Sequence, residues 1–162
     1  MLTQERIKQM FEYREDGHLI RKQTTSRLGK VGEVAGTLKA TKDYYVIGLD
    51  GKRYQAHRVV FMYHHGFLPE FVDHKNGNGL DNRIENLRVA TKSENCRNRT
   101  LHRNNQSGFK NVAWVKSNNA WSVSLSVNGK KKHIGFFKDI EFADLVAQEA
   151  RNLYHGEFAN HH

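Results

Sequence analysis

Two side chains able to carry metal and acid–base chemistry stand next to each other in the middle of the chain. Asp73 and His74 follow the apolar pair Phe71 and Val72, so both are expected at the end of a strand. A carboxylate is a ligand for a hard cation such as Mg²⁺. An imidazole, with an ordinary pKa of about 6.5, can take a proton from water at neutral pH. The pair fits metal-assisted hydrolysis, although an Asp-His pair on its own is usually ordinary surface chemistry.

A third candidate, Asn95, falls in the first turns of an expected helix. Thr91 and Glu94 have the spacing of a capping box, in which each residue satisfies a backbone N–H of the other. Between His74 and this helix lie an Asn/Gly-rich loop and a second strand, so the expected order is strand, loop, strand, helix. The amide oxygen of Asn95 can serve the same cation as Asp73.

Asn86 and the polar residues before it are expected to support this site. Asn86 would fix the loop by bonding its backbone or His74, which would orient the base. The other loop residues are expected to shape the loop and not to act in catalysis: Asn76, Asn78, Asp81 and Asn82.

At these residues the chain resembles a known family. The pattern DH-x-N-G-N-x-x-DNR-x-x-NLR-x-A-T-x-x-EN resembles the HNH nuclease motif in the form found in phage and intron-borne endonucleases. The signature positions fall on His74, Asn86 and Asn95, the last an Asn in place of His. The resemblance implies a ββα-metal fold and cleavage of double-stranded DNA. It implies Asp73 and Asn95 as ligands of Mg²⁺, or else Mn²⁺, His74 as the general base and Asn86 as structural support.

Residues 1–66 predict a β-rich N-terminal extension that leads into one helix. Thr3 is an expected helix start, and residues 15–17 and Asp50-Gly51 are expected hairpin turns. The segment 57–66 predicts a helix ending at a glycine. Basic side chains on or near the motif are expected to contact DNA, although Arg83, Arg88 and Lys92 are as well explained as solvated charges: His57, Arg58, Arg83, Arg88 and Lys92.

The last 50-odd residues form a separate pattern. Three strands, at 109–116, 120–127 and 131–137, precede a helix at 140–154. The helix carries apolar residues along one side at Phe142, Val146, Ala150 and Leu153. The segment resembles the AP2 DNA-binding domain, on matching residues at 107–112, Trp121, 127–130, 134–137, the helix 141–150 and 156–159.

In that family the exposed face of the sheet lies in the major groove of DNA. Alternation predicts Trp121, Val123 and Leu125 toward the helix, and serines outward. The expected DNA contacts are Lys110, Lys116, Ser122, Ser124, Lys131 and His133. The face has little arginine, which predicts weak sequence specificity. Trp114 fits either the core or a DNA groove.

The fold class is therefore α+β in two parts. An HNH nuclease domain spans 1–99, with its core at about 54–99. A linker follows at 100–107, and a three-stranded-sheet-and-helix domain at 108–160. One catalytic group per chain favours a monomer that nicks DNA, although a dimer would cut both strands.

Composition supports a nucleic-acid partner. Lys and Arg outnumber Asp and Glu by 26 to 17, and the net charge of +9 favours polyanion binding. The single cysteine, Cys96, excludes an intrachain disulfide and a cysteine-rich zinc cluster. No apolar run suits a membrane span or a secretory signal, so the expectation is a cytoplasmic protein, in the host cell if phage-encoded. Two rivals stay open: a non-catalytic DNA-binding protein of nuclease shape, and an RNA-directed nuclease, against which the AP2-like segment weighs.

Overall fold

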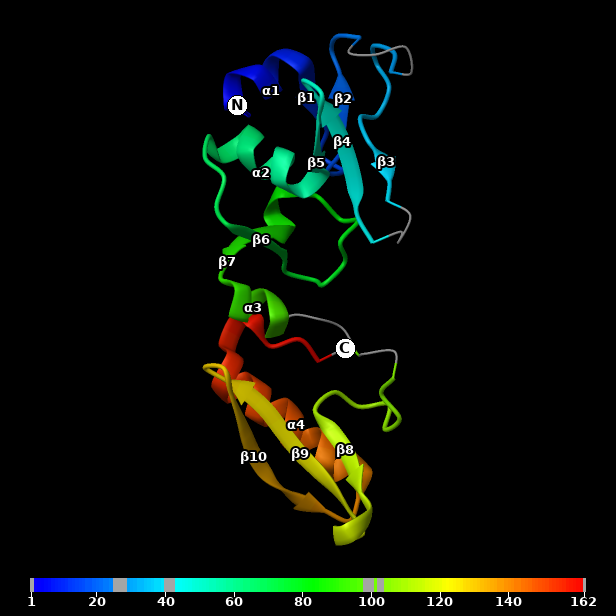
Figure 1. Cartoon of the computed structure of the whole chain (residues 1–162), viewed down its shortest axis with the longest axis vertical. Coiled ribbons are helices and arrows are strands. Elements are labelled where there is room, and N and C mark those ends of the chain that lie inside the picture. The colour runs from blue at the N-terminus through cyan, green and yellow to red at the C-terminus, as the bar shows by residue number, and fades with distance from the viewer. Residues whose placement is uncertain (1, 25–28, 40–42, 98–100, 102–103, 162) are drawn as a thin grey trace. The chain divides into compact units, whose positions relative to one another are not determined.

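Short helices and antiparallel strands alternate along the chain in the computed structural model, which describes residues 2–24, 29–39, 43–97, 101 and 104–161 (Figure 1). They gather into two compact units, Met1–Ala90 and Thr91–His162. None of the described helices is both long and apolar enough to cross a membrane. The mixed α and β content agrees with the expected class, and each unit has its own core.

The first unit begins with a helix and two small sheets. Helix α1 (Gln4–Met10) starts at Thr3, whose side chain accepts a hydrogen bond from the Arg6 amide at 3.2 Å, as expected of an N-cap. Strands β1 (Phe11–Tyr13) and β2 (Leu19–Arg21) form the first hairpin. The second sheet lies in the order β3 (Thr37–Leu38), β4 (Tyr45–Leu49) and β5 (Lys52–Gln55).

Helix α2 (Ala56–His65) links these sheets to the predicted site. Val59 and Val60 on this helix are fully buried, and the helix contacts α1, β4, β5 and β6. It ends where Gly66 takes a left-handed φ of 75°, as expected from the glycine that closes the segment. The helix that carries His57 is therefore anchored in the main core.

The hairpin of the predicted site follows α2. Strand β6 (Phe71–His74) pairs antiparallel with β7 (Leu87–Ala90), and η1 (Ile84–Asn86), a single 3₁₀ turn, leads into β7. Helix α3 (Lys92–Arg97) comes next in the chain. The expected order of strand, loop, strand and helix is confirmed.

The second unit contains a three-stranded antiparallel sheet and one long helix. The sheet order is β10 (Lys130–Phe137), β9 (Ala120–Val127), β8 (Val112–Val115), with the turn η2 (Lys116–Asn118) between β8 and β9. Asn128 and Gly129 join β9 to β10 with φ values of 50° and 76°, which suits a tight type I′ turn. Helix α4 (Ile140–His155) and η3 (Gly156–Phe158) follow.

The face of α4 that packs on the sheet differs from the expected one. Ala143, Ala147 and Ala150 are buried, whereas Phe142 and Leu153 are exposed. Small side chains let the helix lie close to Val112 and Val123 of the sheet, and large ones at these positions would hold it away. The predicted stripe is correct at Ala150 and wrong at Phe142 and Leu153, because the buried face is made of alanines.

The boundary between the units falls before α3. This helix contacts η3 and groups with the C-terminal residues, so the nuclease motif begins in one unit and ends in the other. The sequence placed the linker at 100–107, but residues 98–100 and 102–103 lie outside the described residues. The last residues of the predicted linker belong to the second unit, because Asn105 and Ser107 hydrogen bond to Phe109 and Val112. The rest of the linker stays a prediction.

Candidate active site

Asp73 and His74 are the last two residues of β6, at the loop end of its hairpin with β7. Asp73 lies opposite Arg88, and His74 lies opposite Leu87. Both Asp73 and His74 are buried, with 4% and 5% of their surface exposed. A buried carboxylate and a buried imidazole require polar partners, so their contacts indicate how the site is held.

The partner of Asp73 across the hairpin is Arg88. Arg88 Nε donates to Asp73 Oδ2 at 2.9 Å, and Arg88 Nη2 lies 2.9 Å from the same oxygen. Arg88 is itself largely buried, so the ion pair is shielded from solvent. Arg88, predicted to contact the DNA backbone, therefore lies against the predicted metal ligand.

The partner of His74 is Asn82. Oδ1 of Asn82 lies 3.1 Å from Nε2 of His74, and Asn82 is almost fully buried. Because a carboxamide oxygen accepts, this contact places the imidazole proton on Nε2. Nδ1 of His74 then carries no ring proton.

A second histidine packs on the first. The rings of His57 and His74 meet edge to face with centroids 4.8 Å apart, and Tyr44 borders both rings. His57 is 5% exposed, and no described residue hydrogen bonds to its Nδ1. This burial suits a residue that supports His74 better than one that contacts phosphate.

Burial sets the protonation of both histidines. It lowers the pKa of His57 to about 3, and the nearby charges of His74 and Arg58 add to the effect. Burial also lowers the pKa of His74, whereas the hydrogen bond that the ring donates to Asn82 and the charges of Asp73 and Asp81 act to raise it. Both rings are therefore neutral at neutral pH, and a neutral His74 is a competent base.

Asn86 holds the loop between the two strands. Its Nδ2 donates to Asp81 O at 2.7 Å and to Asn76 Oδ1 at 3.0 Å, and its Oδ1 accepts from the Asn76 amide at 3.1 Å. The Asn86 backbone oxygen accepts from Lys75 N at 2.8 Å. Of the two expected modes, bonding to the loop is the one observed, while Asn82 bonds His74.

The N-terminal extension packs against the same loop. Tyr13 Oη accepts a hydrogen bond from the Ile84 amide at 3.1 Å. Gly17 has a φ of +89°, and a Cβ there would lie 2.5 Å from backbone atoms of Asn82 and Arg83. Only glycine permits this approach, so the first hairpin of the chain helps to hold Asn82 beside His74.

Asn95, the third signature residue, lies on α3 in the second unit. The expected capping box is present: Glu94 N donates to Thr91 Oγ1 at 3.2 Å, and Thr91 N donates to Glu94 Oε2 at 2.7 Å. The local geometry of this helix start is confirmed. Joint binding of one cation by Asp73 and Asn95 stays a prediction.

The remaining basic residues around the motif differ in how they are engaged. Arg83 pairs with Asp81 at 2.7 Å, which neutralises much of its charge locally. Arg58 is half-buried and donates to Glu70 O at 2.8 Å. Lys92 is exposed at the start of α3. Of these three, Lys92 is the side chain best suited to a phosphate contact.

In the second unit, Lys110 has a structural place. Its Nζ donates to Asn160 O at 2.9 Å, and burial lowers the pKa of Lys110 to about 8. Lys110 O accepts in turn from the fully buried Arg151 at 2.7 Å. Lys110 therefore closes the end of this unit and offers little to a groove.

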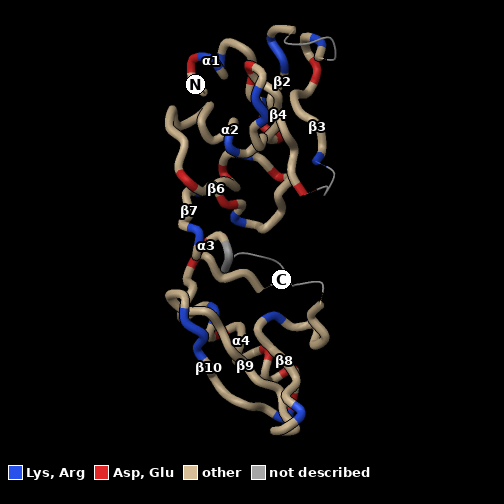
Figure 2. The backbone as a smooth tube through the Cα atoms, viewed as in Figure 1, with Lys and Arg blue, Asp and Glu red and all other residues tan. Residues whose placement is uncertain are grey.

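The outward face of the sheet gains an aromatic residue. A register shift between His133 and Gly135 places Phe136 on the same face as His133, and their rings lie 4.6 Å apart. Nδ1 of His133 lies 3.3 Å from Ser122 Oγ. Lys131 is exposed near the start of β10, along which Figure 2 shows basic residues, and Ser124, opposite His133, is half-buried.

Two site residues were missed by reasoning from the sequence. The sequence predicts loop shaping for Asn82 and a phosphate contact for His57. The spacing of the asparagines does not indicate which side-chain amide contacts His74, because this contact depends on the conformation of the loop. For His57 a signal existed: it stands one turn before Val60 on an apolar helix, a position that faces the core.

Comparison with known proteins defines the class. Residues 54–97 match the family model described as HNH endonuclease, so this part of the chain is an HNH endonuclease domain. The match ends on α3, and the comparisons do not support the AP2-like resemblance of the C-terminal segment. No solved structure matches.

The relative found is a phage protein. Protein 3.8 of Escherichia phage T7 is 30% identical over 125 residues, which cover 75% of this chain and 96% of the relative. The chain belongs to the family of that protein.

The burial of His57 predicts acid sensitivity. Below about pH 6.5 the unfolded chain protonates His57, whereas the folded protein resists until about pH 3. The free energy of unfolding should therefore fall on acidification, by up to about 1.4 kcal/mol per pH unit from this group. Urea titrations between pH 7.5 and 5 measure the slope, which His57→Phe should flatten. His65→Phe, at an exposed site of the same helix, is the matched control. A slope unchanged by His57→Phe would contradict the prediction.

Proposed function

We propose that this protein is a divalent-metal-dependent endonuclease that hydrolyses phosphodiester bonds of double-stranded DNA. The observation that carries the proposal is the buried Asp73–His74 pair within an HNH endonuclease domain, with His74 held by Asn82. The net charge of +9 favours a polyanionic substrate.

In this proposal His74 accepts the proton of the attacking water at Nδ1. Asn82 keeps the proton of the ring on Nε2 and fixes the direction of Nδ1, so His74 is oriented before substrate binds. His57 contributes a buried neutral ring, which adds no positive charge beside the base. Asn86 keeps the loop in the path that delivers Asn82.

The donor atoms of the site fit a hard cation. In this proposal Asp73 would supply a carboxylate and Asn95 an amide oxygen, the ligand type that Mg²⁺ prefers, and Mg²⁺ needs few protein ligands because it keeps several waters. Among the described residues there is no cluster of three or more His, Cys, Asp or Glu side chains for a fully protein-held ion. A bound Mg²⁺, or Mn²⁺, would stabilise negative charge on the phosphate and the leaving oxygen. Arg88 holds the Asp73 carboxylate in place.

We further propose that the C-terminal unit contacts the DNA duplex through the outward face of its sheet, as in AP2-like domains. The basic start of β10 and the exposed pair His133 and Phe136 support this surface. With no arginine on that face, recognition would depend on phosphate contacts and shape, and specificity would be weak. The protein is proposed to act as a monomer in the cytoplasm of a phage host.

A cleavage assay on supercoiled plasmid tests this function. With Mg²⁺, the protein should convert supercoiled plasmid to nicked circles, and EDTA should stop the reaction until excess Mg²⁺ is added back. Appearance of linear DNA without nicked circles would indicate paired cuts by a dimer. An RNA transcript of the same sequence is the substrate control. Plasmid that is bound but uncut would support the binding-only rival, and equal cutting in EDTA would exclude the metal mechanism.

A further inference from the structure

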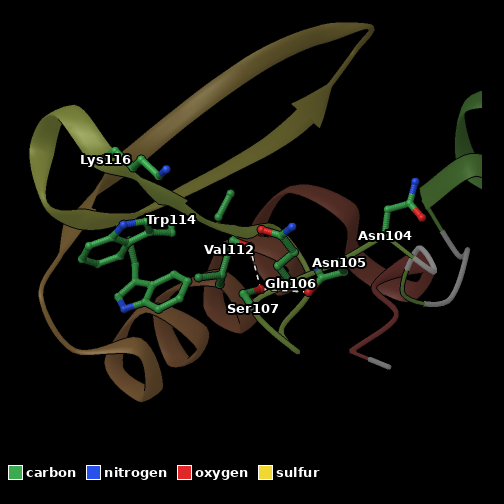
Figure 3. A pocket seen from close by; sticks show the side chains of 9 residues that line it. Asn104, Asn105, Gln106, Ser107, Val112, Trp114 and Lys116 are labelled. Carbon is green, nitrogen blue, oxygen red and sulfur yellow. Dashed lines mark hydrogen bonds between the residues drawn. The ribbon is translucent and has the colours of Figure 1, made fainter.

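A cleft of about 640 Å³ lies beside β8, an edge strand of the C-terminal sheet. This volume is in the range of about 300–1,000 Å³ that small-ligand sites occupy. Its walls combine the indoles of Trp114 and Trp121 with the amides of Asn104 and Gln106 and the cation of Lys116 (Figure 3). All of these residues belong to the second unit.

The two tryptophans form its aromatic wall. Trp114 and Trp121 are cross-strand neighbours, and their rings meet at 65° with centroids 5.0 Å apart. Trp121 packs partly against the core, whereas Trp114 is 44% exposed. Trp121 therefore supports Trp114, which offers exposed indole surface to the cleft. Indole surface of this kind stacks on planar aromatic ligands.

The polar wall is a structured turn. Ser107 Oγ donates to the Val112 carbonyl oxygen at 2.7 Å, and Asn105 Oδ1 accepts from the Gly108 amide at 2.8 Å. These bonds occupy Ser107 and Asn105 in holding the turn. The side chains of Asn104 and Gln106 are exposed, and no described residue engages their amides. Each amide offers donors and an acceptor that match the edge of a nucleobase.

We propose that this cleft binds one unpaired nucleobase of a DNA strand. The base would stack on Trp114, its edge would meet Gln106 and Asn104, and Lys116 would contact the adjoining phosphate. A paired base cannot occupy this site, because its faces are stacked on neighbouring bases and its pairing edge is engaged. The ligand of the cleft is therefore double-stranded DNA that carries a bulge or gap, or a single-stranded stretch of DNA. The inference rests on the proposed DNA substrate.

This cleft is distinct from the outward sheet face. Trp121 alternates with Ser122 along β9, so it lies on the same side as the buried Val123 and opposite to the serines. One surface of the unit would contact the duplex backbone and the other would take an unpaired base. A DNA duplex with a bulge can bind both surfaces, through its backbone and through its unpaired base.

Tryptophan fluorescence tests the proposal directly, because the only two tryptophans of the chain line the cleft. The full chain in EDTA is titrated with a short duplex, with the same duplex carrying a one-base bulge, and with the single strand. The bulged duplex and the single strand should quench the fluorescence saturably, at concentrations at least about tenfold lower than the paired duplex. Stacking of one base contributes about 1–3 kcal/mol, so Trp114→Ala should weaken binding of the bulged duplex by about 5- to 150-fold.

Matched variants separate the cleft from general effects. Trp114→Phe, which keeps an aromatic face, should retain most of the affinity, and Lys116→Ala should lower the salt dependence of binding by about one phosphate contact. Leu153→Ala, at an exposed site of α4, should change nothing. Binding of Trp114→Ala is followed by fluorescence anisotropy of labelled DNA.

Equal affinity for paired and bulged duplex, or unchanged binding by Trp114→Ala, would overturn the proposal. Tighter binding of an RNA strand would overturn its assignment to DNA. Failure of the proposed nuclease function can be distinguished from failure of the proposal for the cleft. If the protein prefers bulged DNA but never cuts plasmid, the proposal for the cleft stands and the proposed nuclease activity fails. If the protein cuts plasmid but shows no preference for unpaired bases, the nuclease activity stands and the proposal for the cleft fails.

Discussion

Replacement of Asp73 by Asn is expected to reduce plasmid cleavage in Mg²⁺ by about 100- to 1,000-fold. A bound cation supplies several kcal/mol of charge stabilisation, and each 1.36 kcal/mol is a factor of ten in rate. Asn keeps the shape of Asp73 and an oxygen for Arg88, but it removes the charge that attracts the cation. The measurement is the initial rate of nicking over a range of Mg²⁺ concentrations.

The ion pair between Asp73 and Arg88 means that Asp73→Asn also affects stability, and a second substitution at Arg88 provides the control. Asp73→Asn leaves the buried guanidinium uncompensated, and breaking a buried pair costs about 3–5 kcal/mol of stability. The double variant Asp73→Asn with Arg88→Gln removes both charges and should recover much of the lost stability, as seen by urea unfolding, without recovering cleavage. Arg88→Gln alone keeps the carboxylate, and Mg²⁺ should raise its melting temperature more than that of the wild type. A stable double variant that cuts like wild type would remove Asp73 from the metal site.

The sequence predicted the local structure of the site more completely than the packing around it. The order of strand, loop, strand and helix, the Thr91–Glu94 capping box and the hairpin turn at Asp50-Gly51 all follow from local patterns, and the structure contains them. Such features depend on residues close in the chain. The residue types within each short segment are therefore enough to specify these local structures.

Features that depend on long-range packing were not predictable. Asn82 reaches His74 because the loop path is held by Asn86 and by Gly17, far away in the sequence. The helix pattern around His57 indicates that His57 faces the core, but its contact with His74 depends on the packing of α2 on β6, which the pattern does not specify. The buried alanine face of α4 was missed because hydrophobicity ranks Phe142 and Leu153 above alanine, whereas close packing favours the smaller side chain.

Loss of the proposed base is the second large effect. His74→Ala should lower the cleavage rate by about 100- to 10,000-fold, the range for removal of a general base. His74→Gln, closer in size, should be equally impaired, because a carboxamide does not take up the proton. Asn82→Ala keeps the imidazole but frees its orientation, and loss of such a supporting residue costs about 10- to 100-fold. A graded series of this kind separates chemistry from positioning.

The direct measurement of the central claim is the single-turnover rate of plasmid nicking in Mg²⁺ by wild type, His74→Gln and His65→Ala. His65 is an exposed histidine at the end of α2, so its loss controls for histidine removal in general. We predict that His65→Ala cuts at the wild-type rate and that folded His74→Gln, checked by its melting curve, is at least about 100-fold slower. If folded His74→Gln nicks plasmid as fast as wild type, His74 is not the base and the proposed active site is wrong.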